Sequence, residues 1–152
     1  MRILDTLKEE TIVPELTATD KKGVLEELVA PVAKVSGFNQ EEMVRVLLER
    51  ERLGSTGIGG GIAIPHGKLK SLDSFLVNFG RSLKGVDFEA IDGKPAHLLF
   101  LLMAPENPTS AHLQMLARIS RLLKDSTFKQ RLMTAADRRE LYTVIANEDR
   151  EF

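Results

Sequence analysis

The chain has 152 residues, of which 43% are hydrophobic and 28% are charged, a composition typical of a soluble globular protein that buries one core. The 21 Lys and Arg residues are offset by 22 Asp and Glu residues, and the net charge of −1 argues against a dedicated nucleic-acid-binding protein. The sequence has no cysteine, which excludes disulfides, thiolate nucleophiles and cysteine-ligated zinc.

The sequence predicts neither a signal peptide nor a membrane-spanning segment. The first residues, MRILDTLKEETIVPEL, contain no apolar stretch followed by a small-residue cleavage site. The longest apolar run, HLLFLLMAP at 97–105, is too short to span a bilayer. We therefore expect a soluble cytoplasmic protein with no direct membrane insertion.

The first third of the chain predicts two helices. Residues 20–35 place apolar side chains at helical spacing with Asp20 as the N-cap, and Pro31 is expected to kink this helix or divide it into two pieces. Gly37 ends it. Asn39 is then expected to cap a helix over 40–53, with glutamates in its first turn and arginines in its last, as the helix dipole favours.

The middle of the chain predicts strands. Five glycines between 53 and 61 indicate a loop, and residues 62–66 follow as a short buried strand that Pro65 is expected to end. Residues 74–82 and 96–104 are the strongest strand predictions, and the segment 85–95 between them is a candidate for a short edge strand.

The last third predicts three helices. Residues 108–123 are amphipathic, with Asn107 as the expected cap and Pro108 as the first helical residue. Residues 126–135 and 137–148 form two closing helices. Helices at both ends with strands between them predict an α/β or α+β domain, a sheet covered by helices.

His66, in the run GGGIAIPHGKL, is the main candidate for chemistry. Pro65 has one fixed backbone dihedral and restricts Ile64 to the extended region, so the backbone before the imidazole is stiff. Gly67 leaves the ring uncrowded on the other side. A stiff, open position of this kind at the end of a predicted buried strand suits a nucleophile or a proton carrier. An ordinary loop histidine is the competing interpretation.

The glycines do not form a nucleotide-binding loop. Lys68 is followed by Leu69 rather than Ser or Thr, and Ile62 occupies a required glycine position in both the Walker A and the dinucleotide patterns. The three histidines, His66, His97 and His112, lack metal-ligand spacing, so no metal and no cofactor are expected. His97 begins a strand beside apolar residues and is predicted to be structural.

His112 lies near the start of the helix predicted over 108–123, where free N–H groups and the helix dipole attract anions. Thr109 and Ser110 add hydroxyl donors there, and Ser55 and Thr56 are further candidate phosphate-binding residues. A solvated surface histidine, and turn roles for Ser55 and Thr56, are equally compatible with the sequence.

The residues from Glu51 to Gly67 fit a family pattern: an acidic residue, six spacers, Ile58-Gly59, two spacers, then IAIPHG. This pattern resembles the signature of the fructose/mannitol-type (type 2) IIA proteins of the bacterial phosphotransferase system. The strings LGSTGIGGGIAIPHGKL, AIDGKPAHLLFLLMAPE, HLQMLARISRLL and ELYTVI are most similar to the nitrogen-regulatory IIA branch. The resemblance covers nearly the whole chain and is weakest before residue 40.

The resemblance implies one IIA domain over residues 1–152, with a mixed parallel and antiparallel β-sheet flanked by helices on both faces. It implies that His66 is the phosphorylated nucleophile and that His112 and Arg50 stabilise the phosphoryl group. The implied donor is an HPr-type or nitrogen-branch phosphocarrier protein. Without the resemblance, the favoured interpretation of Arg50 is a solvated arginine at the C-terminal end of a helix, like Arg52 nearby. Position 97 is His where an acidic residue is expected in related chains.

Three functions follow as hypotheses. The first is a phosphoryl carrier whose phosphorylation state regulates binding to target proteins, which the lack of a IIB-like cysteine or an attached transport domain favours. The second is a sugar-specific IIA protein that passes the phosphoryl group to a separate IIB component. The third is a binding module with a vestigial histidine. A donor docking surface around His66 is expected to include Ile58, Leu69 or Met115 unless these side chains are core.

Overall fold

Capping side chains set the start of the first two helices. In the computed structural model, which describes residues 2–107 and 110–150, helix α1 spans Lys21–Ser36 and helix α2 spans Gln40–Arg52. The Asp20 carboxylate accepts from the N–H of Gly23 at 2.9 Å, and the Asn39 side chain does the same for Glu42. Both predicted caps are confirmed. Helix α1 runs through Pro31 as one helix, so a division into two pieces is wrong.

Five strands form one mixed sheet around a central strand. They are β1 (Gly57–Gly59), β2 (Ile62–Ala63), β3 (His66–Leu69), β4 (Leu76–Val86) and β5 (Ala96–Pro105). Strands β2 and β3 both run parallel to β5 along one of its edges, and β4 pairs antiparallel with its other edge. Strand β1 pairs antiparallel with β2.

Three strand predictions need correction. Pro65 interrupts the strand that begins at Ile62 but does not end it, because pairing with β5 resumes at His66. The proline lacks an N–H, yet its carbonyl accepts from Leu102 at 2.9 Å, so the chain stays beside β5. The segment 53–61, predicted as loop, contains β1. The segment 85–95 forms no edge strand beyond Val86, where β4 ends.

Two hydrophobic cores lie on opposite faces of the sheet. Along β5, Leu99, Leu101 and Met103 point into the core that contains α1 and α2. Leu98, Phe100, Leu102 and Ala104 point into the other core, as the two-residue period of a strand requires. Every one of these side chains is at most 2% exposed. The mixed sheet with helices on both faces is thus confirmed.

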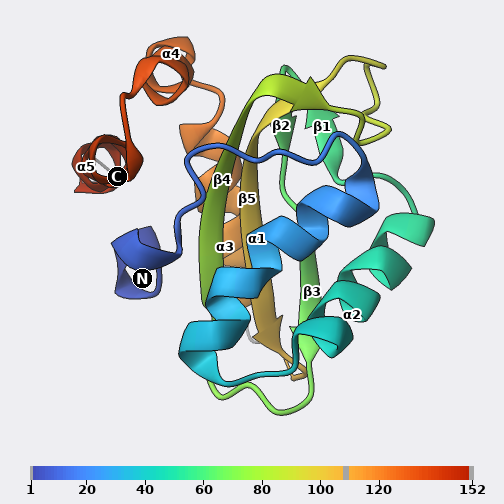
Figure 1. The fold of residues 1–152 in the computed structure, drawn as a ribbon. Coiled ribbons are helices and arrows are strands. Elements are labelled where there is room, and N and C mark those ends of the chain that lie inside the picture. Colours follow the sequence, from blue (N-terminus) through green and yellow to red (C-terminus); the bar gives the residue numbers. More distant parts are fainter. Residues whose placement is uncertain (1, 108–109, 151–152) are drawn as a thin grey trace.

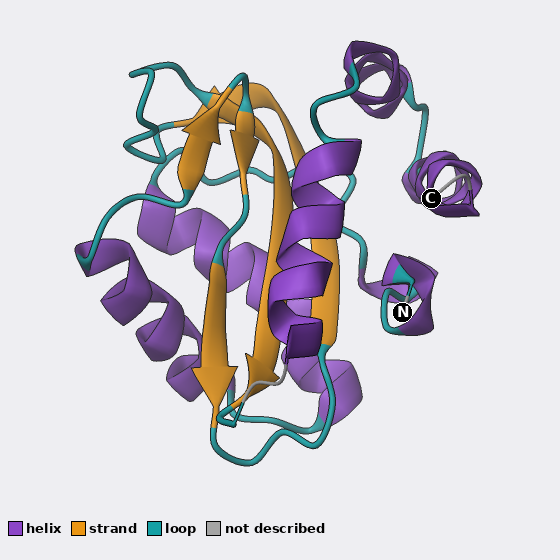
Figure 2. Ribbon diagram, turned by 180° about the vertical axis from the view of Figure 1, so that it is seen from behind, coloured by secondary structure: helices purple, strands orange, loops and turns teal. Residues whose placement is uncertain are grey.

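The second core is covered by the C-terminal helices together with the N-terminal segment. Helix α3 (Ser110–Leu122) lies behind the sheet in Figure 1 and in front of it in Figure 2. Helices α4 (Ser126–Thr134) and α5 (Arg138–Arg150) pack at the side of the sheet, next to the short 3₁₀ turns η1 (Ile3–Asp5) and η2 (Glu9–Thr11). The two ends of the described chain therefore lie close together.

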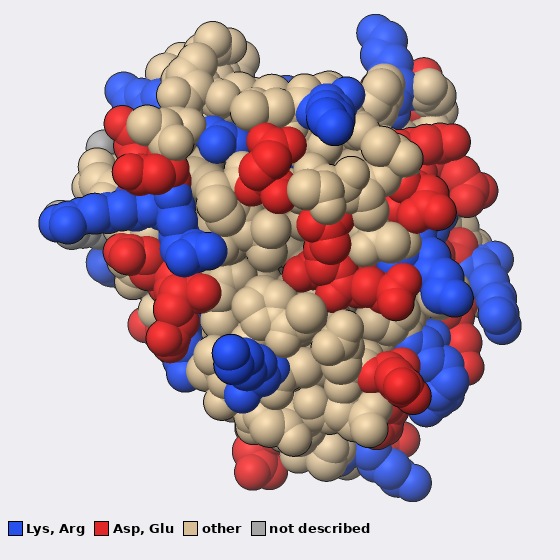
Figure 3. Space-filling view, viewed as in Figure 1, with Lys and Arg blue, Asp and Glu red and all other residues tan. Residues whose placement is uncertain are grey.

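Charges of both signs are interspersed over the face formed by α1 and α2 (Figure 3), as the near-zero net charge predicts. Within residues 2–107 and 110–150, every helix is too short or too polar to cross a lipid bilayer.

Candidate active site

Three residues predicted from the sequence line one open groove of about 480 Å³. Arg50 lies in the last turn of α2, His66 is the first residue of β3, and His112 is the third residue of α3. These elements are distant in sequence and meet at the β3 edge of the sheet. The other lining residues are Val46, Glu49, Leu53, Gly67 and Lys68.

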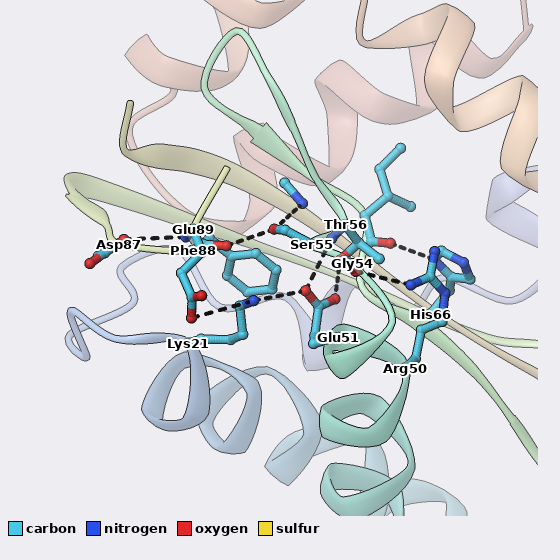
Figure 4. Close-up of polar contacts among 12 residues, drawn as sticks. Lys21, Arg50, Glu51, Gly54, Ser55, Thr56, His66, Asp87, Phe88 and Glu89 are labelled. Atoms are coloured by element: carbon cyan, nitrogen blue, oxygen red, sulfur yellow. Dashed lines mark hydrogen bonds and ion pairs between the residues drawn. The ribbon is translucent and has the colours of Figure 1, made fainter. Parts of the chain in front are cut away.

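A backbone carbonyl fixes the tautomer of His66. The Nδ1 atom of His66 lies 2.7 Å from the carbonyl oxygen of Ile64 (Figure 4). A carbonyl oxygen only accepts hydrogen bonds, so Nδ1 carries the proton. In the neutral ring the lone pair is then on Nε2. Pro65, between the two residues, restricts the backbone that connects them.

Gly67 also has a packing role that was not predicted from the sequence. A Cβ atom built at this position would lie 2.8 Å from Cγ1 of Val46 on α2. The glycine therefore lets α2 pack close against β3, which brings the helix that carries Arg50 next to the strand that carries His66. Because adjacent residues of a strand point to opposite faces, this contact lies on the other side of β3 from the His66 ring, and the prediction that Gly67 leaves the ring uncrowded stays a prediction.

His112, on α3, is a buried residue that lines the groove. Its ring centroid is 6.3 Å from that of His66, with 54° between the ring planes, and it stacks on Phe75 at the same centroid distance with 27° between the planes. The side chain is buried, and Nδ1 has no hydrogen-bond partner among the described residues. Burial, and then the positive charges of His66 and Lys68, lower the pKa of His112, which favours its neutral form.

Arg50 lies beside His66 at the opening of the groove (Figure 4). Its Nη1 donates to the carbonyl of Gly54 at 3.0 Å, which folds the side chain back over the turn that follows α2. Two further backbone bonds close this turn, from Leu53 N–H to Arg50 and from Gly54 N–H to Glu51. Among the described residues, the remaining guanidinium N–H groups have no other partner, so they are available to an anion.

The predicted hydroxyl donors are not brought to the groove as a group. Ser55 donates to the carbonyl of Phe88 at 2.8 Å and accepts from Gly57, and the buried Thr56 hydroxyl donates to Glu51. Both side chains hold the turn, so their predicted phosphate contacts are not supported. Ser110 is exposed at the start of α3. Thr109, together with the predicted first helical residue Pro108, lies outside the described residues.

Two side chains of this site, Lys68 and Phe75, were not predicted from the sequence. Lys68 is two residues after His66 on the same strand, so strand alternation places both side chains on one side of the sheet. That signal was present in the sequence. Phe75, which supports His112, comes from the loop before β4, and no spacing or motif connects the two residues.

His97 lies outside the groove. Its Nδ1 contacts the carbonyl of Ser82 at 2.8 Å, and the ring lines a separate hollow with Gly60 and Lys129. Among the residues that the structure describes, no three His, Cys, Asp or Glu side chains come together as a metal site requires.

Fold and groove together define the class of protein. The family model described as "Phosphoenolpyruvate-dependent sugar phosphotransferase system, EIIA 2" matches residues 5–148. The chain belongs to this family, which confirms the resemblance found in the sequence.

Within the family, the chain is similar to nitrogen regulatory proteins. It is 44% identical over 146 residues to a "Nitrogen regulatory protein" of Bradyrhizobium diazoefficiens, covering 96% of this chain and 95% of that protein. A solved structure of "Nitrogen Regulatory Protein IIA-Ntr" from Neisseria meningitidis superposes with a TM-score of 0.86 at 33% identity, covering 93% of this chain and 97% of that one.

Sugar-specific relatives are also similar. The chain is 36% identical over 151 residues to a "PTS system fructose-specific EIIABC component" of Bacillus subtilis, with 99% of this chain covering 24% of that protein. A complex of mannitol enzyme IIA with phosphorylated enzyme IIB from Escherichia coli contains a chain that superposes with a TM-score of 0.76 at 25% identity, covering 93% of this chain and 99% of that one.

Proposed function

We propose that the chain is a cytoplasmic phosphoryl carrier. In this proposal, the Nε2 atom of His66 accepts a phosphoryl group from an HPr-type or nitrogen-branch phosphocarrier protein. Residues 1–152 act in this proposal as one IIA domain. The observation that supports it most directly is the contact of His66 Nδ1 with the carbonyl of Ile64, since it leaves Nε2 as the free lone pair in an open groove. Membership of the EIIA 2 family supports the same role.

The proposed transfer step needs no base. The Nε2 lone pair of His66 attacks phosphorus in the donor's phosphohistidine, whose ring carries a proton on its other nitrogen. The new N–P bond forms, the old N–P bond breaks, and its electron pair returns to the donor ring, which leaves as a neutral imidazole. His66 keeps its Nδ1 proton, and its phosphorylated ring becomes positively charged. The Ile64 carbonyl then faces that proton and stabilises the charge.

Arg50 and His112 are placed to stabilise the phosphoryl oxygens. A guanidinium presents a planar set of donors that matches such oxygens, and phosphoryl transfer depends mainly on positioning and charge stabilisation. Because burial favours a neutral His112, that ring brings a hydrogen-bond donor without a second positive charge next to His66 before the phosphoryl group arrives. Lys68 adds positive charge at the same groove.

A regulatory output fits the relatives better than sugar transport does. The nitrogen regulatory relative is more similar than the fructose-specific one, at 44% against 36% identity. The phosphoryl group carries about −1.5 to −2 charges, which the positive ring of phosphorylated His66 offsets in part, so the groove becomes more negative. Leu53, which lines the groove, is 85% exposed, and such an apolar side chain suits a protein docking surface whose affinity depends on that charge. Leu113, the residue after His112 on α3, is 68% exposed. Of the other candidates for this surface, Leu69 and Met115 are core residues and Ile58 is exposed.

The test is transfer of labelled phosphoryl from a phosphorylated HPr-type protein to the purified chain. We expect His66→Ala to abolish labelling, and His97→Ala, which changes a histidine outside the groove, to retain it. Label on the His66→Ala protein contradicts the proposal.

The alternative, a sugar-specific IIA protein, is favoured by the fructose-specific relative and by the mannitol complex with phosphorylated IIB. Addition of fructose- and mannitol-type IIB proteins to the labelled chain separates the two functions. A regulatory carrier keeps its label, whereas a sugar-specific IIA loses it to the matching IIB protein.

A further inference from the structure

Glu51 is a buried carboxylate to which the proposed function gives no role. It is the first residue of the family pattern in the sequence, and its side chain is only 4% exposed. Oε1 accepts from the backbone N–H of Thr56 at 3.0 Å, and Oε2 accepts from the Thr56 hydroxyl in a second hydrogen bond. Glu51 therefore fixes both the backbone and the side chain of Thr56 (Figure 4).

Thr56 is connected directly to the segment that holds the nucleophile. The carbonyl of Thr56 accepts from the N–H of Ile64 at 3.0 Å, and the carbonyl of Ile64 contacts His66 Nδ1 at 2.7 Å. Thr56 and Ile64 are each 4% exposed, so water does not replace these bonds readily. A continuous series of hydrogen bonds thus runs from the Glu51 carboxylate to the imidazole of His66.

The same carboxylate also holds the turn against which Arg50 rests. Residues 53–56 leave α2 and return to the sheet, and Arg50 Nη1 donates to Gly54 inside this turn. Thr56, at the far end of the turn, is fixed by Glu51. The segment 53–56 therefore connects Glu51 to the Arg50 guanidinium through Gly54. It also connects Glu51 to the His66 imidazole, through Thr56 and Ile64.

Lys21 neutralises the buried carboxylate. Its Nζ lies 3.1 Å from Glu51 Oε1 and 5.1 Å from the centre of the Phe88 ring. The lysine side chain is 13% exposed, so the pair lies largely out of solvent. A partly buried ion pair is a specific arrangement rather than a strong source of stability, and loss of one partner leaves the other charge uncompensated.

We propose that Glu51, with Lys21 as its counter-ion, is a positioning residue for phosphoryl transfer: through Thr56 and Ile64 it holds His66 in the Nδ1–H tautomer with Nε2 toward the groove, and through the turn at 53–56 it holds Arg50 in place. This inference rests on the proposed role of His66. It assigns to Glu51 no contact with the phosphoryl group.

The test compares Glu51→Gln and Thr56→Val with the wild-type chain. Glu51→Gln keeps the size of the side chain but removes the charge and one acceptor, and Thr56→Val removes only the hydroxyl. Small misplacements of reacting groups are costly, so we expect Glu51→Gln to lower the rate of phosphoryl transfer by about 10- to 100-fold with little change in the KM for the donor. Thr56→Val should have a smaller effect in the same direction.

The decisive readout is the tautomer of His66, followed by ¹⁵N NMR of its ring about two pH units above the ordinary histidine pKa. The wild type should show a proton on Nδ1 alone, whereas both variants should show a mixture of tautomers. A merely structural role for Glu51 lowers stability without changing this signature.

Glu27→Gln is the matched control. Glu27 also accepts from two backbone N–H groups, those of Thr17 and Ala18, and from the Thr17 hydroxyl. It lies on α1, away from the groove. We expect this variant to keep the wild-type tautomer and transfer rate.

A wild-type tautomer and rate in both Glu51→Gln and Thr56→Val overturns the inference, and if Glu51→Gln does not fold, the tautomer in Thr56→Val decides it alone. If the wild-type chain accepts no phosphoryl group, the proposed function fails, but the tautomer comparison still tests whether Glu51 positions His66.

Discussion

Gly67→Ala tests whether the close packing of α2 on β3 sets the geometry of the groove. The added Cβ would lie 2.8 Å from Cγ1 of Val46, whereas ordinary contacts begin near 3.4 Å, so strand and helix must separate by about 0.6 Å. Val46 cannot move aside easily because β-branched side chains in helices favour one rotamer. Overpacking of this kind costs about 1–3 kcal/mol of unfolding free energy.

The same separation moves Arg50 away from His66, since one residue is on α2 and the other on β3. A displacement of this size is expected to slow phosphoryl transfer by roughly tenfold, as misplacement by 1 Å costs on the order of 100-fold. Urea unfolding measures the first effect and single-turnover transfer from a labelled HPr-type donor measures the second.

Val46→Ala in the Gly67→Ala background is the matched control. It removes the methyl group that the new Cβ meets, so most of the lost stability and rate should return. Unchanged stability and rate in Gly67→Ala, or no recovery in the double variant, would refute the steric explanation.

Three further predictions concern other residues. Because the pKa of His112 is lowered in the folded state, the unfolded chain binds the proton first as the pH falls, so His112 reduces the unfolding free energy increasingly below the unfolded pKa of about 6.5. Between pH 7.5 and 5.5, urea unfolding should show a smaller loss of unfolding free energy for His112→Gln than for the wild type. Equal losses contradict the lowered pKa. Arg81→Met should lower the unfolding free energy by about 3 kcal/mol, because the buried guanidinium donates to the carbonyls of Pro14, Leu132 and Ala135; a loss below about 1 kcal/mol shows that these carbonyls find other donors. Asp125→Ala should cost about 1 kcal/mol by removing the N-cap of α4 and leave transfer unchanged, so a slower transfer in this variant indicates coupling between α4 and the groove.

The elements that the sequence predicts well are those with local causes. Asp20 and Asn39 cap helices because a short polar side chain can bond the free N–H groups of the first turn, and this needs no tertiary information. The apolar run at 96–105 is buried on both faces, which its continuous hydrophobicity predicts.

The errors arise where tertiary contacts override a local signal. Glycines at 57–59 favour a loop, yet pairing with β2 makes them a strand. Pro65 favours the end of a strand, but β5 supplies a partner on both sides of it. Ser55 and Thr56 have the chemistry of phosphate ligands, and only the structure shows that Phe88 and Glu51 already use their hydroxyls.

The chain places the groove between two separate cores, because His112 is on the helix that packs in one core and Arg50 is on the helix that packs in the other. A dianion held by both side chains would link the two helical layers at the edge of the sheet. The phosphorylated protein should therefore melt at a higher temperature and exchange the amide protons of α2 and α3 more slowly, so that its partners encounter a stiffer molecule as well as a more negative one.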